Sequence, residues 1–326
     1  MRALVAGATG ALGQALIPKL RAGGHEVVAV SRSEGSRQEL EALGAEHAVG
    51  DLLAADELRR VVRSAAPDVV VHAAKAIPKR GPLTHRDMRA TNRLHDEGTA
   101  NLLDAAISAG ARRFIGESIV FAYGYGDFGS TDITEDHPTR SRVPRRKLFE
   151  EIDGVLAMER HAFEANDAGA IEAIVLRCGL FYGPRAGTDY MAIMLRRRML
   201  PLPGGGGAVW PLVYIDDVAD AVVRATTGGQ PGGVYHVVDD EPVALWDFAS
   251  ELARRVGARR PWSAPKPLAR LFVPYFAEVA TTSMRVSNAR AKVELGWKPE
   301  HPTYREGLDA WQAVTLIGRT RDSSAE

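Results

Sequence analysis

The feature that most constrains the fold is a glycine-rich turn near the start of the chain, GATGALG at residues 7–13. It follows an apolar run at 3–7 and opens a segment whose apolar residues recur at helical spacing. Gly7 lets the chain turn sharply at the strand end, Gly10 lets a ligand approach the backbone, and Gly13 lets the helix pack closely on the sheet. The chain is therefore expected to begin with a strand, a tight turn and a helix.

This turn is also suited to bind an anion, because amides at a helix N-terminus and the helix dipole both attract negative charge. Glycine-rich turns also arise for steric reasons alone, so the spacing by itself is weak evidence. Here the strand before and the helix after supply the context that a dinucleotide-binding motif requires. We therefore predict that residues 7–13 hold the pyrophosphate of a dinucleotide, with a purely structural turn as the alternative.

The first half of the chain alternates apolar runs with helical patterns. The runs are rich in valine and nearly continuous, which is typical of strands buried on both faces of a parallel sheet. Strand–helix–strand repetition predicts an α/β fold with a doubly wound parallel sheet, the Rossmann architecture, and right-handed crossovers. Strands are predicted at 3–7, 26–32, 46–51, 68–74, 112–118 and 171–177, and helices at 36–43, 54–65 and 84–109.

The second half is less regular, since loops rich in glycine and proline separate its elements. Strands are predicted at 209–217 and 233–240, and helices at 188–198, 217–226, 244–256 and 303–317. The domains predicted from these patterns are a dinucleotide-binding Rossmann domain at 1–177, to which 209–240 return strands, a smaller C-terminal substrate-binding lobe at 178–208 and 241–318, and a frayed tail at 319–326.

Composition excludes several classes of partner. Lysine plus arginine equals aspartate plus glutamate at 41 each, which argues against a nucleic-acid or membrane-surface protein. Cys178 is the single cysteine, so a disulfide framework is excluded, and no histidine pair has metal-ligand spacing with acid support, so no metal site is expected. The start of the chain leaves no room for a signal peptide, and no apolar run reaches the roughly 20 residues that span a bilayer. We expect a cytoplasmic protein, as a monomer or homodimer.

The end of the second predicted strand indicates which dinucleotide binds. A chain that selects NAD places a carboxylate there to accept hydrogen bonds from the ribose hydroxyls. This strand instead ends with Ser31, Arg32 and Ser33, and a guanidinium is suited to a 2′-phosphate. NADP is therefore the predicted cofactor and NAD the second choice. Asp51, after the third strand, is placed to meet the adenine, with capping of the following helix as the alternative.

Six motifs occur in order along the chain: AGATGALG (6–13), VVVHAA (69–74), TNRLHDEGTANLLDAA (91–106), LRCGLFYGPR (176–185), LVYIDDVADAV (212–222) and KVELGWKPEHPTYREGL (292–308). Together they resemble the extended short-chain dehydrogenase/reductase family, also called the NAD-dependent epimerase/dehydratases. The resemblance covers nearly the whole chain and implies that the substrate lies between the cofactor and the C-terminal lobe. The cofactor-binding residues that it implies, together with our own candidates, are Gly7, Thr9, Gly10, Ala11, Leu12, Gly13, Arg32, Asp51, Leu52, Ala73, Ala74, Lys75, Asn92 and Ser118.

The family's usual chemistry relies on a tyrosine that transfers a proton, a lysine four residues later that lowers its pKa, and a serine or threonine that binds the substrate oxygen. Placing Arg177 on the family's arginine and Glu159 on its helix glutamate needs no gap. In that register the tyrosine position falls on Glu151 and the lysine position on Val155, and neither side chain can do the corresponding task.

Other registers do not restore the set. A shift of eight residues puts Lys147 on the lysine position but Val143 on the tyrosine position, and the chain contains no Tyr-x-x-x-Lys at all. The hydroxyl position, five residues before the closing glycine of 116–124, is Ile119, with Ser118 one step earlier. A one-residue slip reverses the direction of a strand side chain unless a bulge restores it.

Three outcomes follow for the reaction. The chain is a reductase with a non-standard proton donor, or its substrate delocalises the negative charge that hydride brings, or the cofactor is bound without turnover. The candidate catalytic residues are Ser118, Tyr123, Glu117 and Tyr182, with Tyr125 and Tyr190 as further donors. We predict an NADPH-dependent reductase of a small carbonyl, enone or quinone-like substrate. The alternatives are a nucleotide-sugar epimerase/dehydratase-like enzyme and a catalytically silent NADP-binding sensor or scaffold.

Overall fold

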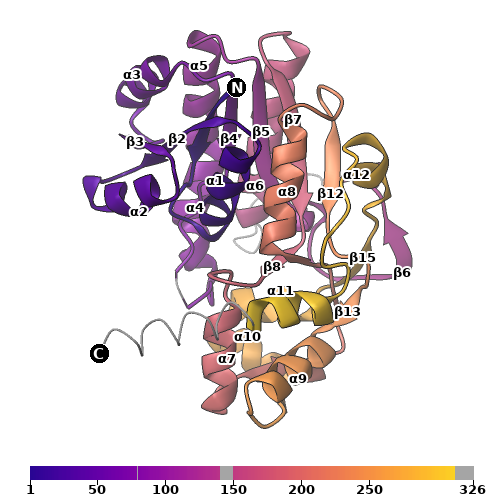
Figure 1. Ribbon diagram of the computed structural model, residues 1–326. Coiled ribbons are helices and arrows are strands. Elements are labelled where there is room, and N and C mark those ends of the chain that lie inside the picture. Colours follow the sequence, from indigo (N-terminus) through magenta and orange to yellow (C-terminus); the bar gives the residue numbers. More distant parts are fainter. Residues whose placement is uncertain (79, 140–149, 313–326) are drawn as a thin grey trace, which may run out of the picture.

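The computed structural model describes residues 1–78, 80–139 and 150–312, with the backbone alone at 150 and 151. Within these residues, seven parallel strands form one central sheet in the order β3-β2-β1-β4-β5-β7-β12 (Figure 1). Their bounds are β1 Arg2–Ala6, β2 Glu26–Ser31, β3 Glu46–Val49, β4 Val69–His72, β5 Arg113–Ile119, β7 Glu172–Cys178 and β12 Val234–Val237. The strand order reverses direction between β1 and β4, so the predicted doubly wound α/β fold is confirmed.

Helices cover both faces of the sheet. Alternate strand residues point to opposite faces, so Val5 and Val71 pack on one layer of helices and Leu4 and Val70 on the other. The first layer contains α1 (Ala11–Ala22), α2 (Arg37–Ala42) and α8 (Ile215–Ala225), and the second α3 (Ala55–Ala65), α5 (Thr99–Ser108) and α6 (Glu150–Asp167). Burial on both faces explains why the strands are continuous valine-rich runs.

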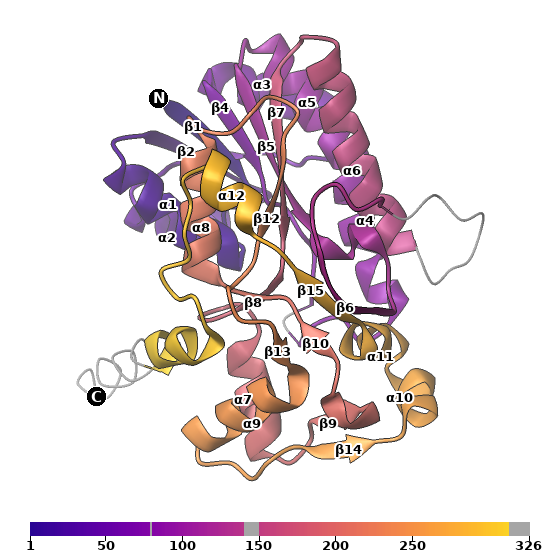
Figure 2. The ribbon, with the colours of Figure 1, turned by 90° about the vertical axis from the view of Figure 1, so that its right-hand side faces the viewer.

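The C-terminal lobe lies beyond the carboxyl ends of the central strands (Figure 2). Its helices are α7 (Thr188–Arg196), α9 (Leu245–Arg255), α10 (Lys266–Phe272) and α11 (Pro274–Thr281), and α12 (Ala289–Glu294) returns toward the sheet. Short strand pairs lie outside the central sheet: β8 (Leu180–Tyr182) with β11 (Leu212–Tyr214), β9 (Pro201–Pro203) with β14 (Trp262–Ala264), β10 (Val209–Trp210) with β13 (Val243–Ala244), and β6 (Asp127–Ile133) with β15 (Ser283–Val286). The lobe therefore faces the sheet edge at which the glycine-rich turn lies.

Two sequence expectations about the second half need correction. Within 209–240, every residue of which is described, β12 joins the central sheet, whereas β10 and β11 pair with lobe strands. Helices α10 and α11 were not anticipated, because prolines break the apolar run that contains them. In each helix the proline lies in the first turn, where its missing amide proton has no partner to lose. The predicted tail at 319–326 lies outside the described residues.

The predicted helix at 84–109 is present but is not uniform. It opens with a 3-10 turn at His85–Met88, continues as α4 (Arg89–Arg93), widens into a π-helical turn at Leu94–Gly98 and ends as α5. Thr84 and Asp87 form a reciprocal capping box at its start, which fixes the point at which the loop after β4 becomes helical. In the described part of the chain, every helix is too short or too polar to cross a bilayer.

Candidate active site

The glycine-rich turn has the geometry that its spacing predicts. Gly7 has a φ of 95°, and a Cβ built there would collide with the Ala73 carbonyl. A Cβ on Gly13 would lie 2.5 Å from the Ala8 Cα, so the helix can approach the preceding chain only through glycine. Gly10 is exposed, and the nearest atom to its Cβ position is the Gly7 carbonyl oxygen at 3.2 Å. The space in front of Gly10 is therefore open.

The helix that follows keeps this end free for an anion. Every residue of α1 is described, and its first turn contains no acidic residue. The residue at its N-cap, Gly10, has no side chain that could bond to the first amides. The first amides of a helix have no partner within it. These amides and the helix dipole thus point toward the open space, and the arrangement can hold a diphosphate. Thr9, Ala11 and Leu12, the other predicted contacts, are part of the same turn.

The end of β2 offers a cation where the adenosine ribose is expected. The Ser31 hydroxyl donates to the Ser33 carbonyl at 3.0 Å and lies 2.8 Å from His47 Nε2, so it is occupied by the protein. Arg32 is exposed, and in the described part of the chain it forms no ion pair or hydrogen bond. The guanidinium of Arg32 is therefore available to a ligand phosphate.

Asp51 and Leu52 form the turn after β3. The Asp51 carboxylate accepts a hydrogen bond from the Leu53 backbone amide at 3.0 Å, and the Leu52 carbonyl accepts one from the side-chain amide of Asn101 at 2.8 Å. Helix α3 begins after Ala54, so Asp51 shapes the turn rather than capping that helix. Its second oxygen remains able to accept from an adenine.

The loop after β4 brings Lys75 next to the glycine-rich turn. The Ala73 amide donates to the Ala6 carbonyl at 2.9 Å, which holds this loop against the end of β1. Lys75 Nζ lies 2.5 Å from Glu117 Oε1 on β5 and 5.2 Å from the centre of the Phe181 ring. The Glu117 side chain is 2% exposed and that of Lys75 is 21% exposed. Burial raises the pKa of Glu117, and the adjacent Lys75 ammonium opposes that rise.

Ser118 faces the opposite side of β5 and belongs to a buried network. Its hydroxyl donates to Glu159 Oε1 on α6 at 2.6 Å, and Arg177 on β7 donates to both oxygens of Glu159, at 2.8 and 2.7 Å. Arg177 also donates to the Tyr123 hydroxyl at 2.8 Å, which lies 2.7 Å from His236 Nε2. Burial raises the pKa of Tyr123 to about 12, so this hydroxyl is a weak acid.

The bidentate Glu159–Arg177 pair supports the register in which these two residues occupy the family's glutamate and arginine positions. Val155, the residue that this register predicts for the lysine position, is buried and apolar, with 6% of its surface exposed. A Cβ on Gly154 would lie 3.0 Å from the Asn92 Cα, so α6 packs closely on α4 here. The lysine position thus carries no charge. The side chain of Glu151, and both Val143 and Lys147, lie outside the described residues.

Tyr182 ties the sheet domain to the lobe. Its hydroxyl donates to Asp239 at 2.9 Å and lies 3.3 Å from the Thr303 carbonyl, and the residue is 2% exposed. Tyr125 is partly exposed instead, with its ring centre 5.3 Å from that of Phe121, and Tyr190 is also partly exposed. Among the predicted donors, Tyr123 and Tyr182 therefore have hydroxyls committed to structural partners.

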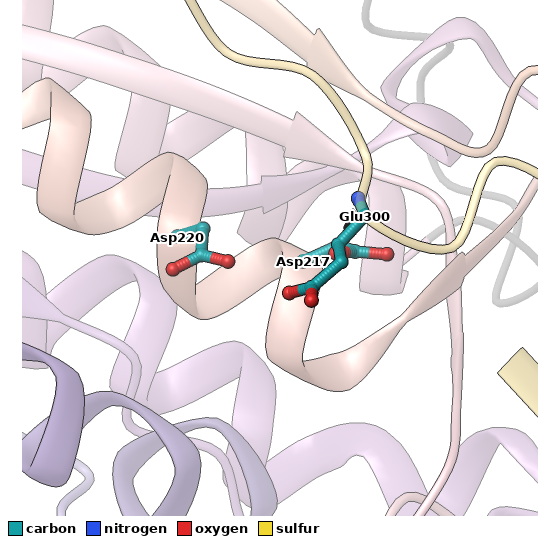
Figure 3. A group of neighbouring side chains, drawn as sticks. All are labelled: Asp217, Asp220 and Glu300. Atoms are coloured by element: carbon teal, nitrogen blue, oxygen red, sulfur yellow. Dashed lines mark hydrogen bonds between the residues drawn. The ribbon is translucent and has the colours of Figure 1, made fainter. Parts of the chain in front are cut away.

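A carboxylate cluster at Asp217, Asp220 and Glu300 was not anticipated (Figure 3). Asp217 and Asp220 come from successive turns of α8, and Glu300 comes from the segment that crosses it. Asp217 accepts hydrogen bonds from the amides of Glu300 and His301 at 2.9 and 3.0 Å, and Asp220 pairs with Lys19. Donors of the chain itself therefore use the carboxylates of Asp217 and Asp220, and Asp217 holds the Glu300–His301 segment against α8.

Sequence reasoning did not find the pairing within the site. Lys75 was predicted as a cofactor contact and Glu117 as a catalytic candidate, but nothing in their spacing, 42 residues apart, showed that they meet. The network of Ser118, Glu159 and Arg177 also escaped prediction. The one available signal was the family register, which placed Glu159 and Arg177 at related positions.

The Rossmann sheet and the open phosphate turn are suited to bind a dinucleotide, and the family match and relatives named as reductases make the protein an NAD(P)-dependent oxidoreductase. More specifically, the chain belongs to the NAD dependent epimerase/dehydratase family, whose model matches residues 3–238. The resemblance inferred from the motifs is thereby confirmed.

Relatives with reductase names span nearly the whole chain. One, 37% identical over 314 residues, is a 3-diazoavenalumate denitrifying reductase of a Streptomyces species, with 94% of this chain and 99% of the relative covered. Another is a 4-hydroxy-2-methyl-3-oxo-4-farnesyl-3,4-dihydroquinoline-1-oxide ketoreductase of Stigmatella aurantiaca, 26% identical with 98% of each chain covered. The crystal structure of dTDP-glucose 4,6-dehydratase from Streptomyces venezuelae, solved with NAD, has a TM-score of 0.80 at 21% identity and covers 98% of each chain. The description of the matching family, NAD dependent, indicates that the cofactor is a nicotinamide dinucleotide.

Proposed function

We propose that this protein is an NADPH-dependent reductase of a small, electron-poor organic molecule. The acceptor atoms are the β-carbons of enones and quinones and the diazo-bearing carbons of aromatic compounds. The observation that carries the proposal is a contrast: the phosphate turn is complete, whereas the residue that the Glu159–Arg177 register predicts for the family's lysine position, Val155, is buried and apolar. Such a site is suited to acceptors that require hydride but no strong acid.

The chemistry of these acceptors explains why the acid is dispensable. Hydride leaves C4 of the dihydronicotinamide with its electron pair and forms a C–H bond to the acceptor carbon. In a quinone or enone the displaced π electrons spread onto a conjugated oxygen, which gives a phenolate-like or enolate anion of low basicity. In an aromatic diazo compound the C–N bond breaks and N₂ leaves. Neither route needs a proton as acidic as that of an activated tyrosine.

The relatives support this substrate class. The Streptomyces relative is named as a denitrifying reductase of a diazo compound, and the Stigmatella relative as a ketoreductase of a 3-oxo-3,4-dihydroquinoline-1-oxide. A nucleotide-sugar epimerase or dehydratase must instead move a proton on a saturated sugar alcohol, whose alkoxide is strongly basic. The apolar Val155 at the lysine position favours the conjugated acceptors.

NADP is the proposed form of the cofactor. Arg32 is exposed at the end of β2, where a chain selective for NAD has a carboxylate. The Ser31 hydroxyl is already engaged with Ser33 and His47, so Arg32 is the group that would recognise the 2′-phosphate. The predicted contacts in residues 7–13, at Asp51 and Leu52, and at Ala73 and Ala74 complete the proposed cofactor site.

The test joins binding to turnover. Calorimetric titration should show heat for NADPH and a weaker response to NADH. The loss of NADPH absorbance is then followed with menadione, cinnamaldehyde and benzenediazonium, each against a blank without enzyme, and gas analysis detects N₂ from the diazonium. Enzyme-dependent oxidation with at least one acceptor supports the proposal. Binding without oxidation of NADPH by any of them would replace it with the sensor or scaffold function, and no binding at all would refute it.

A further inference from the structure

The structure presents one charged pair at the edge where hydride would be delivered. Lys75 follows the end of β4 by three residues, and the preceding Ala73–Ala74 backbone touches the Gly7 turn. Glu117 lies on β5, one residue after Gly116, which pairs with the last residue of β4. The pair therefore lies where the carboxyl ends of β4 and β5 meet, beside the phosphate turn and beneath the lobe.

The two partners are unequal in exposure, and only Lys75 can therefore reach a ligand. Glu117 is 2% exposed and sealed within the sheet, whereas Lys75 retains 21% exposure. An ammonium has three N–H donors, and the bond to Glu117 uses one of them. The Phe181 ring covers another side of the ammonium at 5.2 Å. The remaining donor capacity of Lys75 therefore points toward the open side of the sheet edge, with Glu117 as a fixed counter-ion.

The titratable groups that pack around this pair are neutral at neutral pH. Burial lowers the pKa of His72 to about 4, and its ring is held by the Leu94 carbonyl and the Ala74 amide. Burial also lowers the pKa of His95 and raises that of Cys178 well above its usual value. The field at this edge is thus governed by Lys75 and Glu117, in surroundings of low polarity that strengthen any bond from the ammonium.

We propose that Lys75 binds the oxygen on which negative charge develops during hydride transfer, and that Glu117 positions Lys75 for this task. The inference rests on the proposed function and identifies its charge-stabilising group. As hydride moves from C4 of the dihydronicotinamide to the acceptor carbon, the electron pair of the acceptor's π bond moves to the conjugated oxygen. That oxygen accepts a hydrogen bond from Lys75. The proton then passes from Nζ to that oxygen, and the neutral amine regains a proton from water. This role differs from that of the family lysine, which acts through a tyrosine.

Lys75→Met is the decisive variant, because it removes the charge and keeps most of the side-chain volume. Lys19→Met is the matched control, since Lys19 is similarly exposed, pairs with Asp220 at 3.0 Å and lies on the α1–α8 contact. With menadione, kcat of Lys75→Met should fall at least about 100-fold, the scale of one lost oxyanion donor. With benzenediazonium, a cationic acceptor that forms no oxyanion, kcat should change less than about fivefold. Equal losses with both acceptors would overturn the proposal.

A spectroscopic titration tests the same group without turnover. 4-Nitrophenol bound to the NADP⁺ complex mimics a phenolate product, and its colour reports ionisation. A nearby ammonium should lower its pKa by about one unit or more in the wild type and in Lys19→Met, but not in Lys75→Met. Glu117→Gln should give an intermediate shift and a kcat loss that the conservative Glu117→Asp partly restores. A 4-nitrophenol pKa that is as low in Lys75→Met as in the wild type would refute the assignment.

The variants are designed to separate misfolding from loss of function. Lys75→Met leaves the Glu117 carboxylate buried without a partner, which is costly. The double variant Lys75→Met/Glu117→Gln removes both charges, so it should unfold at the same denaturant concentration as the wild type, bind NADPH within about threefold, and lose menadione reduction as fully as the single variant. Full activity in the double variant overturns the Lys75 inference alone. A wild-type enzyme that oxidises no NADPH overturns the proposed function together with it.

Discussion

A single methyl group should separate cofactor binding from folding at the glycine-rich turn. In Gly10→Ala the new Cβ would lie 3.2 Å from the Gly7 carbonyl oxygen, a contact relieved by a shift of a few tenths of an ångström. Gly10 has a φ of −76° and a ψ of 170°, which alanine adopts without strain. The poorer helix cap costs about 0.5–1 kcal/mol, and the stiffer unfolded chain offsets a similar amount. Folding stability should therefore change by less than about 1 kcal/mol.

Cofactor affinity should respond much more strongly. The same methyl group occupies the open space in which the diphosphate would lie against the first amides of α1. Loss of one hydrogen bond to a charged group costs about 1.5–3 kcal/mol, which corresponds to binding that is about 10- to 100-fold weaker. We expect calorimetry to show this loss for both NADPH and NADH, because the diphosphate is common to them.

Two further glycines calibrate the experiment. Gly23→Ala lies at the other end of α1, with a φ of −75° and its nearest neighbour, a His25 side-chain atom, also at 3.2 Å, so it should alter neither stability nor affinity. Gly13→Ala places a methyl 2.5 Å from the Ala8 backbone and should destabilise the fold by about 1–3 kcal/mol in urea titration. If Gly10→Ala binds NADPH as well as Gly23→Ala does, the amides of α1 do not hold the diphosphate.

Three other outcomes follow from the structure. Arg32→Ala should erase the preference for NADPH over NADH in calorimetry. If the affinities for NADPH and NADH are equal both in the wild type and in the variant, the Arg32 argument is wrong. Tyr123→Phe and Tyr182→Phe should each change kcat less than about threefold. Each should lower the free energy of unfolding by about 1–3 kcal/mol, because a buried partner loses a hydrogen bond. A loss of turnover at unchanged stability would make that tyrosine the proton donor. Burial lowers the pKa of His236 from 6.5 to about 3, so stability should fall as pH falls from about 6.5 toward about 3. At about pH 4.5, protonation of His236 should have lowered the free energy of unfolding by about 3 kcal/mol. In urea titration, the free energy of unfolding of His236→Gln should lack this part of the decrease with pH.

The cofactor half of the candidate site was accessible from the sequence because its elements are local. Gly7, Gly10 and Gly13 lie within one turn, and their spacing alone states which of them must lack a side chain. Arg32 could be placed because it ends a strand whose boundaries were plain. These predictions depend on a few successive residues and on the strand and helix that flank them.

The reaction half was only partly accessible. The register that puts Glu159 and Arg177 at family positions agrees with their bidentate contact, and the residue that it predicts for the lysine position, Val155, is a buried side chain. Ser118 was a reasonable candidate from its place in the motif, but its hydroxyl faces α6 and donates to Glu159. Because successive residues of a strand face opposite layers, the assignment depended on the strand's orientation in the sheet.

The sequence by itself determined that this chain winds a parallel sheet around a phosphate turn, and that no tyrosine precedes a lysine by four residues. Both follow from periodicity and short spacings, which local sterics and hydrogen bonding enforce. Only the tertiary structure decided that Lys75 meets Glu117, and that Ser118 and Tyr123 are engaged in a buried network with Arg177. The hydrogen bonds in these two groups join residues 41 to 54 positions apart, so they depend on the order of the strands and on the face of the sheet from which each side chain extends.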